Sequence, residues 1–218
     1  GAVYDYSGLE KWVKYALENE AVILFDAAYE AYISEDNLPT SIYQIEGAKE
    51  CAIEFCSLSK TAGFTGTRCG YTIVPDNIKS EGVTLNKLWR RRQTTKFNGT
   101  AYVIQRGAAA VFSKQGQEQI KKDIAYYMDN AKMISRTLTE LNIWHTGGKN
   151  SPYIWFKCPL GGSSWEFFDI LLEKANVIGT PGSGFGTNGE GYFRMTGFAS
   201  KERTIEACDR MKKLLGGR

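Results

Sequence analysis

The residues best suited to chemistry lie just after or before three apolar runs in the first third of the sequence. The run at 21–25 ends in Asp26, which opens the segment Asp-Ala-Ala-Tyr at 26–29. The run at 52–56 leads into Ser-Leu-Ser-Lys at 57–60, and Arg68 stands just before the third run, at 69–74. Runs of this length are typical of buried strands, and α/β sheets bind ligands beyond the carboxyl ends of their strands. We therefore expect the three groups to meet at one sheet edge.

These residue types suit one cofactor, pyridoxal phosphate (PLP). The amine of Lys60 can form a covalent Schiff-base link to its aldehyde, and the carboxylate of Asp26 can face the pyridine nitrogen and keep it protonated. Tyr29 can donate to the phenolic oxygen. The phosphate dianion needs hydroxyls and a guanidinium, which the sequence offers at Ser57, Ser59 and Arg68. The amine of Lys60 can also serve as the base that moves a proton of the substrate.

Each of these residues taken alone has a plainer interpretation. A single lysine after a strand is usually a surface residue, and a single aspartate there is usually part of a turn or a cap. An arginine in a glycine-rich loop is often only solvated. The prediction therefore depends on finding all of them together, at neighbouring strand ends.

The elements that must position these groups form an α/β first part. The sequence predicts a helix that begins at a capping box of Ser7 and Glu10 and strands over the three apolar runs. Helical structure follows over 85–112, with a break near Asn98 and Gly99. The clearest element is a helix over 117–141, whose apolar residues recur every three or four positions on one face.

A smaller α+β part is predicted beyond that helix. We expect strands at 153–156, 177–178 and 192–195, a helix at 165–175 and a closing helix at 201–215. The sequence therefore predicts three segments: 1–115, a long connecting helix at 116–142, and a small domain at 143–218.

Composition excludes several classes of protein. The net charge is +3, which is too small to indicate a nucleic-acid partner. No apolar run approaches the ~20 residues of a membrane span, and no signal peptide is expected. The single histidine, His145, excludes multi-histidine metal sites, so no metal is expected. The five cysteines form no C-x-x-C pair, which favours free thiols in the cytoplasm.

Three longer motifs contain or extend the short groups. They lie at 54–71 (Glu-Phe-Cys-Ser-Leu-Ser-Lys-Thr-Ala-Gly-Phe-Thr-Gly-Thr-Arg-Cys-Gly-Tyr), 91–99 (Arg-Arg-Gln-Thr-Thr-Lys-Phe-Asn-Gly) and 193–198 (Phe-Arg-Met-Thr-Gly-Phe). With these motifs the sequence resembles the fold-type I aminotransferases, and among them it is similar to the LL-diaminopimelate aminotransferases. The resemblance implies an aspartate aminotransferase-like α/β fold. Residues 1–115 would be the second half of the PLP-binding large domain, with a mostly parallel sheet, and 143–218 a small α+β domain.

The resemblance also implies roles for single residues. It agrees with the cofactor roles given above and adds Arg194, which would bind the substrate α-carboxylate through a bidentate fork, a role that lysine cannot fill equally. Asn98 would contact the substrate, across the interface of a homodimer. The implied reaction is reversible transfer of an amino group from LL-2,6-diaminopimelate to 2-oxoglutarate, giving tetrahydrodipicolinate, glutamate and water in lysine biosynthesis.

One departure from the family pattern concerns the beginning of the chain. Family members carry an Asn-Pro-Thr-Gly turn before the first helix, and this chain begins at what resembles that glycine, Gly1. We therefore expect it to be the carboxyl-terminal half of the enzyme, inactive or nearly so when alone.

Alternative interpretations remain. The chain could belong to another fold-type I aminotransferase, to a non-catalytic aminotransferase-like ligand-binding module, or be a structural fragment. Two short motifs are weaker. The G-x-G-x-x-G at 184–189 lacks the helix that dinucleotide binding requires, and favours a loop beside the substrate. Ser57 and Lys60 match the S-x-x-K of penicillin-binding proteins, but the accompanying S-D-N and K-T-G are absent.

Overall fold

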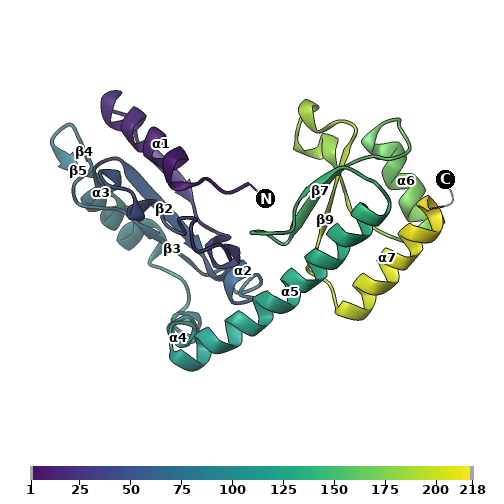
Figure 1. The fold of residues 1–218 in the computed structure, drawn as a ribbon. Coiled ribbons are helices and arrows are strands. Elements are labelled where there is room, and N and C mark those ends of the chain that lie inside the picture. Colours follow the sequence, from purple (N-terminus) through teal and green to yellow (C-terminus); the bar gives the residue numbers. More distant parts are fainter. Residues whose placement is uncertain (1, 217–218) are drawn as a thin grey trace. The chain divides into compact units, whose positions relative to one another are not determined.

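The longest helix, α5 (Lys114–Glu140), contains the point at which the chain divides into two units (Figure 1). The structure is a computed structural model that describes residues 2–216. A first unit comprises Val3–Lys121, and a second unit begins at Lys122. The helix predicted over 117–141 is confirmed and begins a few residues earlier. Gly1, at which the family turn would end, lies outside the described residues.

Helix α1 (Tyr6–Glu18) covers a small apolar core in the first unit. Its buried residues, Leu9, Val13 and Ala16, recur at helical spacing. They share a core with apolar residues of the segment that leads into β2: Ile42, Ile45, Ala48, Cys51 and Ala52. The helix is capped by Asp5, whose Oδ1 accepts a hydrogen bond from Gly8 N–H at 2.7 Å. A carboxylate at this position satisfies an N–H of the first turn. The predicted capping box of Ser7 and Glu10 is therefore wrong.

The sheet of the first unit contains β1 (Ile23–Asp26), β2 (Ala52–Ser57) and β3 (Gly70–Ile73), in that order. β1 and β2 are parallel, whereas β2 and β3 are antiparallel. A mostly parallel sheet, as predicted, is thus not found among the described residues. The reason is the short return after β2, which contains only the four-residue α2 (Leu58–Thr61) and a loop. A parallel neighbour requires a crossover that runs back along the sheet.

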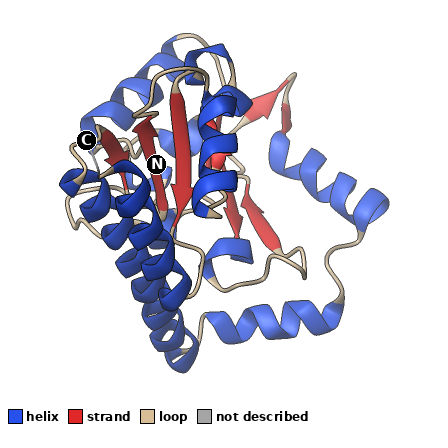
Figure 2. Cartoon of the chain, turned by 90° about the vertical axis from the view of Figure 1, so that its right-hand side faces the viewer, coloured by secondary structure: helices blue, strands red, loops and turns tan. Residues whose placement is uncertain are grey.

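Short helices and a hairpin complete the first unit. The segment between β1 and β2 contains the 3₁₀ helices η1 (Glu30–Tyr32), η2 (Ile42–Gln44) and η3 (Ala48–Glu50). After β3 the chain forms β4 (Lys79–Ser80), β5 (Val83–Thr84), α3 (Leu85–Arg92), the π-helical turn η4 (Gln93–Phe97) and α4 (Tyr102–Val111). Figure 2 shows α3 directly after the β4–β5 hairpin and α4 joined to it by a loop. The predicted break is confirmed, because Asn98 has a left-handed φ of 65°.

The second unit is an antiparallel sheet packed on helices. The strands β6 (His145–Gly147), β7 (Tyr153–Lys157), β9 (Tyr192–Thr196) and β8 (Thr180–Pro181) lie side by side in that order. Residues of β7 and β9 share one core with α5, α6 (Ser164–Ala175) and α7 (Lys201–Leu215). The predicted strand at 177–178 is wrong, since Val177 N–H instead bonds to Leu171 O at the end of α6. Among residues 2–216, no helix combines the length and apolarity of a membrane span.

A buried amide ties α5 to the loop after β9. Asn130 is 1% exposed, and its Nδ2 donates to Gly197 O at 3.1 Å and to Ala199 O at 2.8 Å. Asn130→Ala should lower the free energy of unfolding by about 1–3 kcal/mol, because two largely buried carbonyls lose their donor. Urea unfolding followed by circular dichroism measures this. The control Asp129→Ala removes a carboxylate that is 64% exposed and should cost less than about 0.5 kcal/mol. Equal losses of unfolding free energy in the two variants would contradict the stabilising role of the Asn130 hydrogen bonds.

Candidate functional site

Asp26 stands at the carboxyl end of β1, at the edge where β2 also ends. The parallel register places Asp26 opposite Phe55, and Ala27 N–H donates to Phe55 O at 2.8 Å. The carboxylate folds onto its own turn, where Oδ1 accepts from Ala28 N–H at 3.0 Å. Asp26 is exposed. Its carboxylate is therefore fixed in direction and accessible to a ligand at this edge.

Lys60 lies on α2, directly after the end of β2. Ser57 caps this helix, and its Oγ accepts a hydrogen bond from Ser59 N–H at 3.2 Å. The hydroxyl of Tyr32 donates to Lys60 O at 3.1 Å, which ties the segment after β1 to α2. The ring of Tyr29 packs against that of Tyr32, with centroids 6.0 Å apart. The predicted cofactor residues that follow β1 and β2 are thus joined through Tyr32, which the sequence did not single out.

Arg68 returns to the same edge through the loop after α2. Its Nη1 donates to Thr65 O at 2.8 Å and lies 3.5 Å from Ser59 Oγ. Its φ of 56° lies in the left-handed region, which is strained for a residue with a side chain. Two residues on, a Cβ at Gly70 would lie 2.7 Å from Cys56 O, so the close return to β2 requires glycine there.

The donor set at this edge fits a phosphorylated aldehyde cofactor. Hydroxyls and a guanidinium, the groups that suit a phosphate dianion, come together at Ser57, Ser59 and Arg68. The loop leaves room beside them, because a Cβ at Gly63 or at Gly66 would meet no atom within 4 Å. These residues could hold the phosphate end of PLP, with Lys60 available for its aldehyde.

Two predicted substrate residues lie elsewhere. Asn98 is exposed at the end of η4, between α3 and α4. Arg194 belongs to the second unit, where it stands on β9 opposite Trp155 of β7. Its guanidinium carbon lies 4.4 Å from the ring centre of Tyr153 and 4.5 Å from that of Phe185. The structure thus gathers the predicted cofactor residues in the first unit, whereas the predicted substrate-binding Arg194 belongs to the second.

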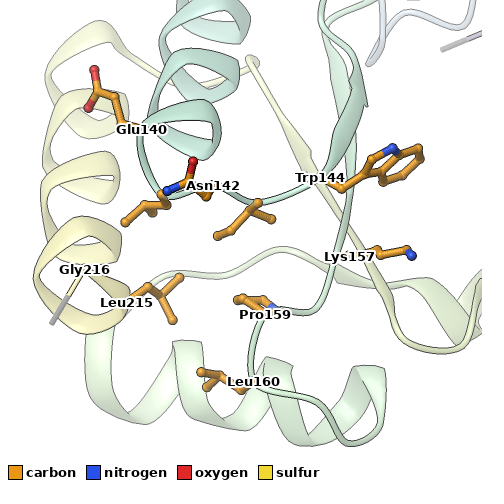
Figure 3. A pocket seen from close by; sticks show the side chains of 10 residues that line it. Glu140, Asn142, Trp144, Lys157, Pro159, Leu160, Leu215 and Gly216 are labelled. Carbon is orange, nitrogen blue, oxygen red and sulfur yellow. The ribbon is translucent and has the colours of Figure 1, made fainter. Parts of the chain in front are cut away.

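A pocket of about 450 Å³ in the second unit is a poor alternative site (Figure 3). Six of its ten lining residues are apolar: Leu141, Ile143, Trp144, Pro159, Leu160 and Leu215. The carboxylate of Glu140 at its rim is already paired with Lys212 Nζ at 2.6 Å. None of the residues with predicted chemistry lines this pocket, so the sheet edge around Lys60 remains the candidate site.

Sequence reasoning missed a buried acidic residue behind this edge. Glu54 of β2 is 2% exposed, and its Oε2 accepts from Ser41 Oγ at 2.7 Å and from Ile42 N–H at 3.0 Å. It lies close to Glu30 and Cys56, with their ligand atoms all within 4.8 Å. A charged residue inside an apolar run was the signal that could have revealed it.

The pKa values of two members of this cluster, Cys56 and Glu30, are raised. Burial raises the pKa of Cys56 to about 12, so its thiol stays protonated at neutral pH. Burial, and then the charge of Glu54, also raise the pKa of Glu30. The thiol of Cys56 lies 3.6 Å from Glu54 Oε1, to which it can donate. Glu54 and Cys56 thus belong to a buried hydrogen-bonded network on β2, with the half-buried Glu30 beside them.

Comparison with known proteins places this geometry in a family. Residues 1–211 match the family described as aminotransferase class I and II. The chain belongs to this aminotransferase family. It is 57% identical over 218 residues to an LL-diaminopimelate aminotransferase of Prochlorococcus marinus (strain NATL1A), and 58% identical over 220 residues to one of Azobacteroides pseudotrichonymphae. These matches cover 98% and 99% of this aminotransferase chain but 53% and 55% of the relatives, so the chain spans about half their length.

Solved structures confirm the α/β aminotransferase fold. An LL-diaminopimelate aminotransferase from Chlamydomonas reinhardtii is similar at a TM-score of 0.94 and 41% identity, covering 99% of this chain and 53% of that one. An aromatic aminotransferase from Pyrococcus horikoshii is similar at a TM-score of 0.86 and 27% identity, covering 99% and 56%. The family resemblance inferred from the three longer motifs is therefore confirmed.

The paired carboxylates of this aminotransferase chain predict a pH-dependent stability. The unfolded chain loses the Glu30 proton near pH 4.5, whereas the raised pKa keeps it bound in the folded chain. The stabilising contribution is therefore complete below about pH 4.5 and is lost as pH rises through the raised value. Glu30→Gln stays neutral, so its stability relative to the wild type should increase between about pH 4 and about pH 8.

Chemical unfolding at both pH values measures this difference, with hydrogen exchange of β2 amides as a local probe. Glu46→Gln is the matched control, because Glu46 is exposed in the same segment. Its stability difference from the wild type should stay constant with pH. The same pH dependence in both variants would contradict the role assigned to the neighbouring carboxylates of Glu30 and Glu54.

Proposed function

We propose that this chain supplies the PLP-binding lysine and the substrate-binding arginine of an LL-diaminopimelate aminotransferase. The reaction is reversible transfer of an amino group from LL-2,6-diaminopimelate to 2-oxoglutarate, which yields tetrahydrodipicolinate, glutamate and water in lysine biosynthesis. The observation that carries this proposal is the gathering of Ser57, Ser59, Lys60 and Arg68 beside Asp26 at one sheet edge. Identity of 57–58% to curated enzymes of that name supports the substrate.

The cofactor roles follow from the chemistry of the side chains. When bound, PLP supplies an electron-withdrawing ring that stabilises negative charge at the substrate α-carbon. Asp26 keeps the pyridine nitrogen protonated, and Tyr29 donates to the phenolic oxygen. Lys60 holds the cofactor aldehyde and, once released, its Nζ takes the proton from the substrate α-carbon. The phosphate is bound by Ser57, Ser59 and Arg68.

Two further residues bind the substrate in this proposal. The planar guanidinium of Arg194 binds the α-carboxylate through two N–H groups. Asn98 contacts the substrate from the partner subunit of a homodimer. The segment around Asn98 supports an interface, because large apolar side chains are exposed on it: Leu88, Phe97, Tyr102 and Val103. We further propose that the chain alone turns over little or no substrate and that the enzyme works in the cytoplasm, where its five cysteines stay free.

The second candidate is another fold-type I aminotransferase that acts on aromatic substrates. The likeness to the Pyrococcus horikoshii aromatic aminotransferase favours it, at lower identity. The holoenzyme is here the PLP-loaded full-length enzyme that contains this chain. Its activity against diaminopimelate and a panel of aromatic and alanine-like amino acids separates the two. A non-catalytic module is less well supported, because it would not need a substrate-binding arginine such as Arg194 in addition to an intact set of cofactor residues.

Lys60 is the decisive residue of the proposal. Borohydride reduction of the holoenzyme followed by peptide mass spectrometry should locate the cofactor on Lys60. Lys60→Ala should abolish this modification and lower kcat at least about a thousandfold. The control Lys49→Ala changes an exposed lysine before β2 and should leave both unchanged. Modification of a different lysine, or full turnover by Lys60→Ala, would refute the assignment.

Arg68 should determine how tightly the cofactor binds. Arg68→Ala removes a charge-assisted contact to the phosphate, so the Kd of PLP should rise roughly tenfold or more. Arg68→Lys retains the charge without the fork and should give an intermediate Kd. Titration followed by absorbance measures these values, and Arg136→Ala, an exposed arginine of α5, serves as control. An unchanged Kd in Arg68→Ala would remove Arg68 from the phosphate site.

A further inference from the structure

Arg194 is held by two aromatic rings at once. Its guanidinium carbon lies 4.4 Å from the ring centre of Tyr153 and 4.5 Å from that of Phe185, well within the range of a cation–π contact. We infer that Tyr153 and Phe185, here called the aromatic pair, are positioning residues that fix Arg194 for binding a carboxylate. The inference rests on the proposed function, in which Arg194 binds the substrate α-carboxylate.

The geometry of a guanidinium explains how stacking prepares it for an anion. Rings contact the flat faces of the group, whereas a bidentate carboxylate binds in its plane, along the N–H edge. The two kinds of contact therefore do not compete. Stacking also restricts a long side chain that would otherwise sample many rotamers, so less freedom is lost when the carboxylate binds.

Each ring of the aromatic pair also packs against a further aromatic ring. Tyr153 packs edge-on against Phe198, with ring centroids 6.0 Å apart. Phe185 packs edge-on against Trp155 at 5.6 Å, and Trp155 stacks on Tyr192 at 5.5 Å with an interplanar angle of 19°. These residues come from β7, β9 and the two loops that flank β9, so the sheet itself fixes the position of Arg194.

The glycine-rich segment at 184–189 has a clear part in this arrangement. The base of its loop is closed, since a Cβ on Gly182 would lie 2.1 Å from Gly189 O. At the tip, a Cβ on Gly184 or Gly186 would meet no atom within 4 Å, and Gly186 has a φ of 112° that only glycine adopts readily. Phe185, the last residue of the 3₁₀ helix η5 (Gly182–Phe185), is 51% exposed and lies against the guanidinium. A motif that resembles a nucleotide fingerprint thus serves to place a ring.

Steady-state kinetics of the holoenzyme test the aromatic pair. Phe185→Leu and Tyr153→Leu should each raise the KM for 2-oxoglutarate roughly three- to thirtyfold, with kcat changed less than about twofold. Phe185→Tyr and Tyr153→Phe retain the rings and should restore the wild-type KM. The matched control is Trp165→Leu, an aromatic residue of α6 that is 56% exposed and packs on Phe168.

Nuclear magnetic resonance of the 218-residue chain gives a readout that does not depend on turnover. Ring currents should shift the Arg194 Nε–Hε resonance upfield in the wild type, and the Leu variants should lose this shift. The resonance is assigned by its loss in Arg194→Lys. Addition of glutarate should perturb it at lower concentration in the wild type than in the Leu variants.

The two measurements separate the possible failures. A wild-type holoenzyme that transfers no amino group to 2-oxoglutarate refutes the proposed function, and the resonance data then decide on the aromatic pair. An unshifted Arg194 resonance in the wild type overturns the inference. Leu variants with an unchanged KM also overturn the inference, whether or not their kcat falls.

Discussion

The direction of β3 is the constraint on which the candidate site depends. Arg68 precedes this strand, so it lies at whichever end of the sheet β3 begins. Because β3 runs antiparallel to β2, with Gly70 opposite Ser57, it begins where β2 ends. A parallel β3 would begin at the other end of β2, roughly 20 Å away at about 3.3 Å per residue. Arg68 can reach Ser59 only because β3 runs antiparallel to β2 and not parallel to it, as the sequence predicted.

Elements with a strong local pattern were predictable from the sequence. Helix α7 occurs at its predicted bounds, Lys201–Leu215, and α6 and α5 within a few residues of theirs. Each carries an apolar stripe at helical spacing, a property of the segment itself. Strand direction and short strands were not predictable, because they depend on which partner is available. Val177 shows this, since its N–H is used to end α6 and the next strand starts only at Thr180.

The same distinction separates the parts of the site. Ser57, Ser59 and Lys60 are close in sequence, so their proximity follows from one short helix and could be inferred from spacing. Glu54 was overlooked because alternation places it on the buried face of β2, where only the fold supplies Ser41 Oγ and Ile42 N–H as partners. Burying a carboxylate without such hydrogen-bond donors would cost much free energy of folding. The sequence pattern of β2 does not show which donors the fold will bring to Glu54.

The two arginines of the proposed enzyme are arranged on the same principle, by different means. Arg68 uses part of its guanidinium to donate to Thr65 O at 2.8 Å, from a backbone held at a φ of 56°. The guanidinium carbon of Arg194 lies 4.4 Å from the ring centre of Tyr153 and 4.5 Å from that of Phe185. In each case contacts within the protein limit the side chain before an anion arrives. An arginine side chain carries about 2 kcal/mol of rotamer entropy, so restriction beforehand strengthens anion binding without any added contact to the anion. The backbone strain at Arg68 is the cost of that preorganisation, and the return of β3 keeps it in place.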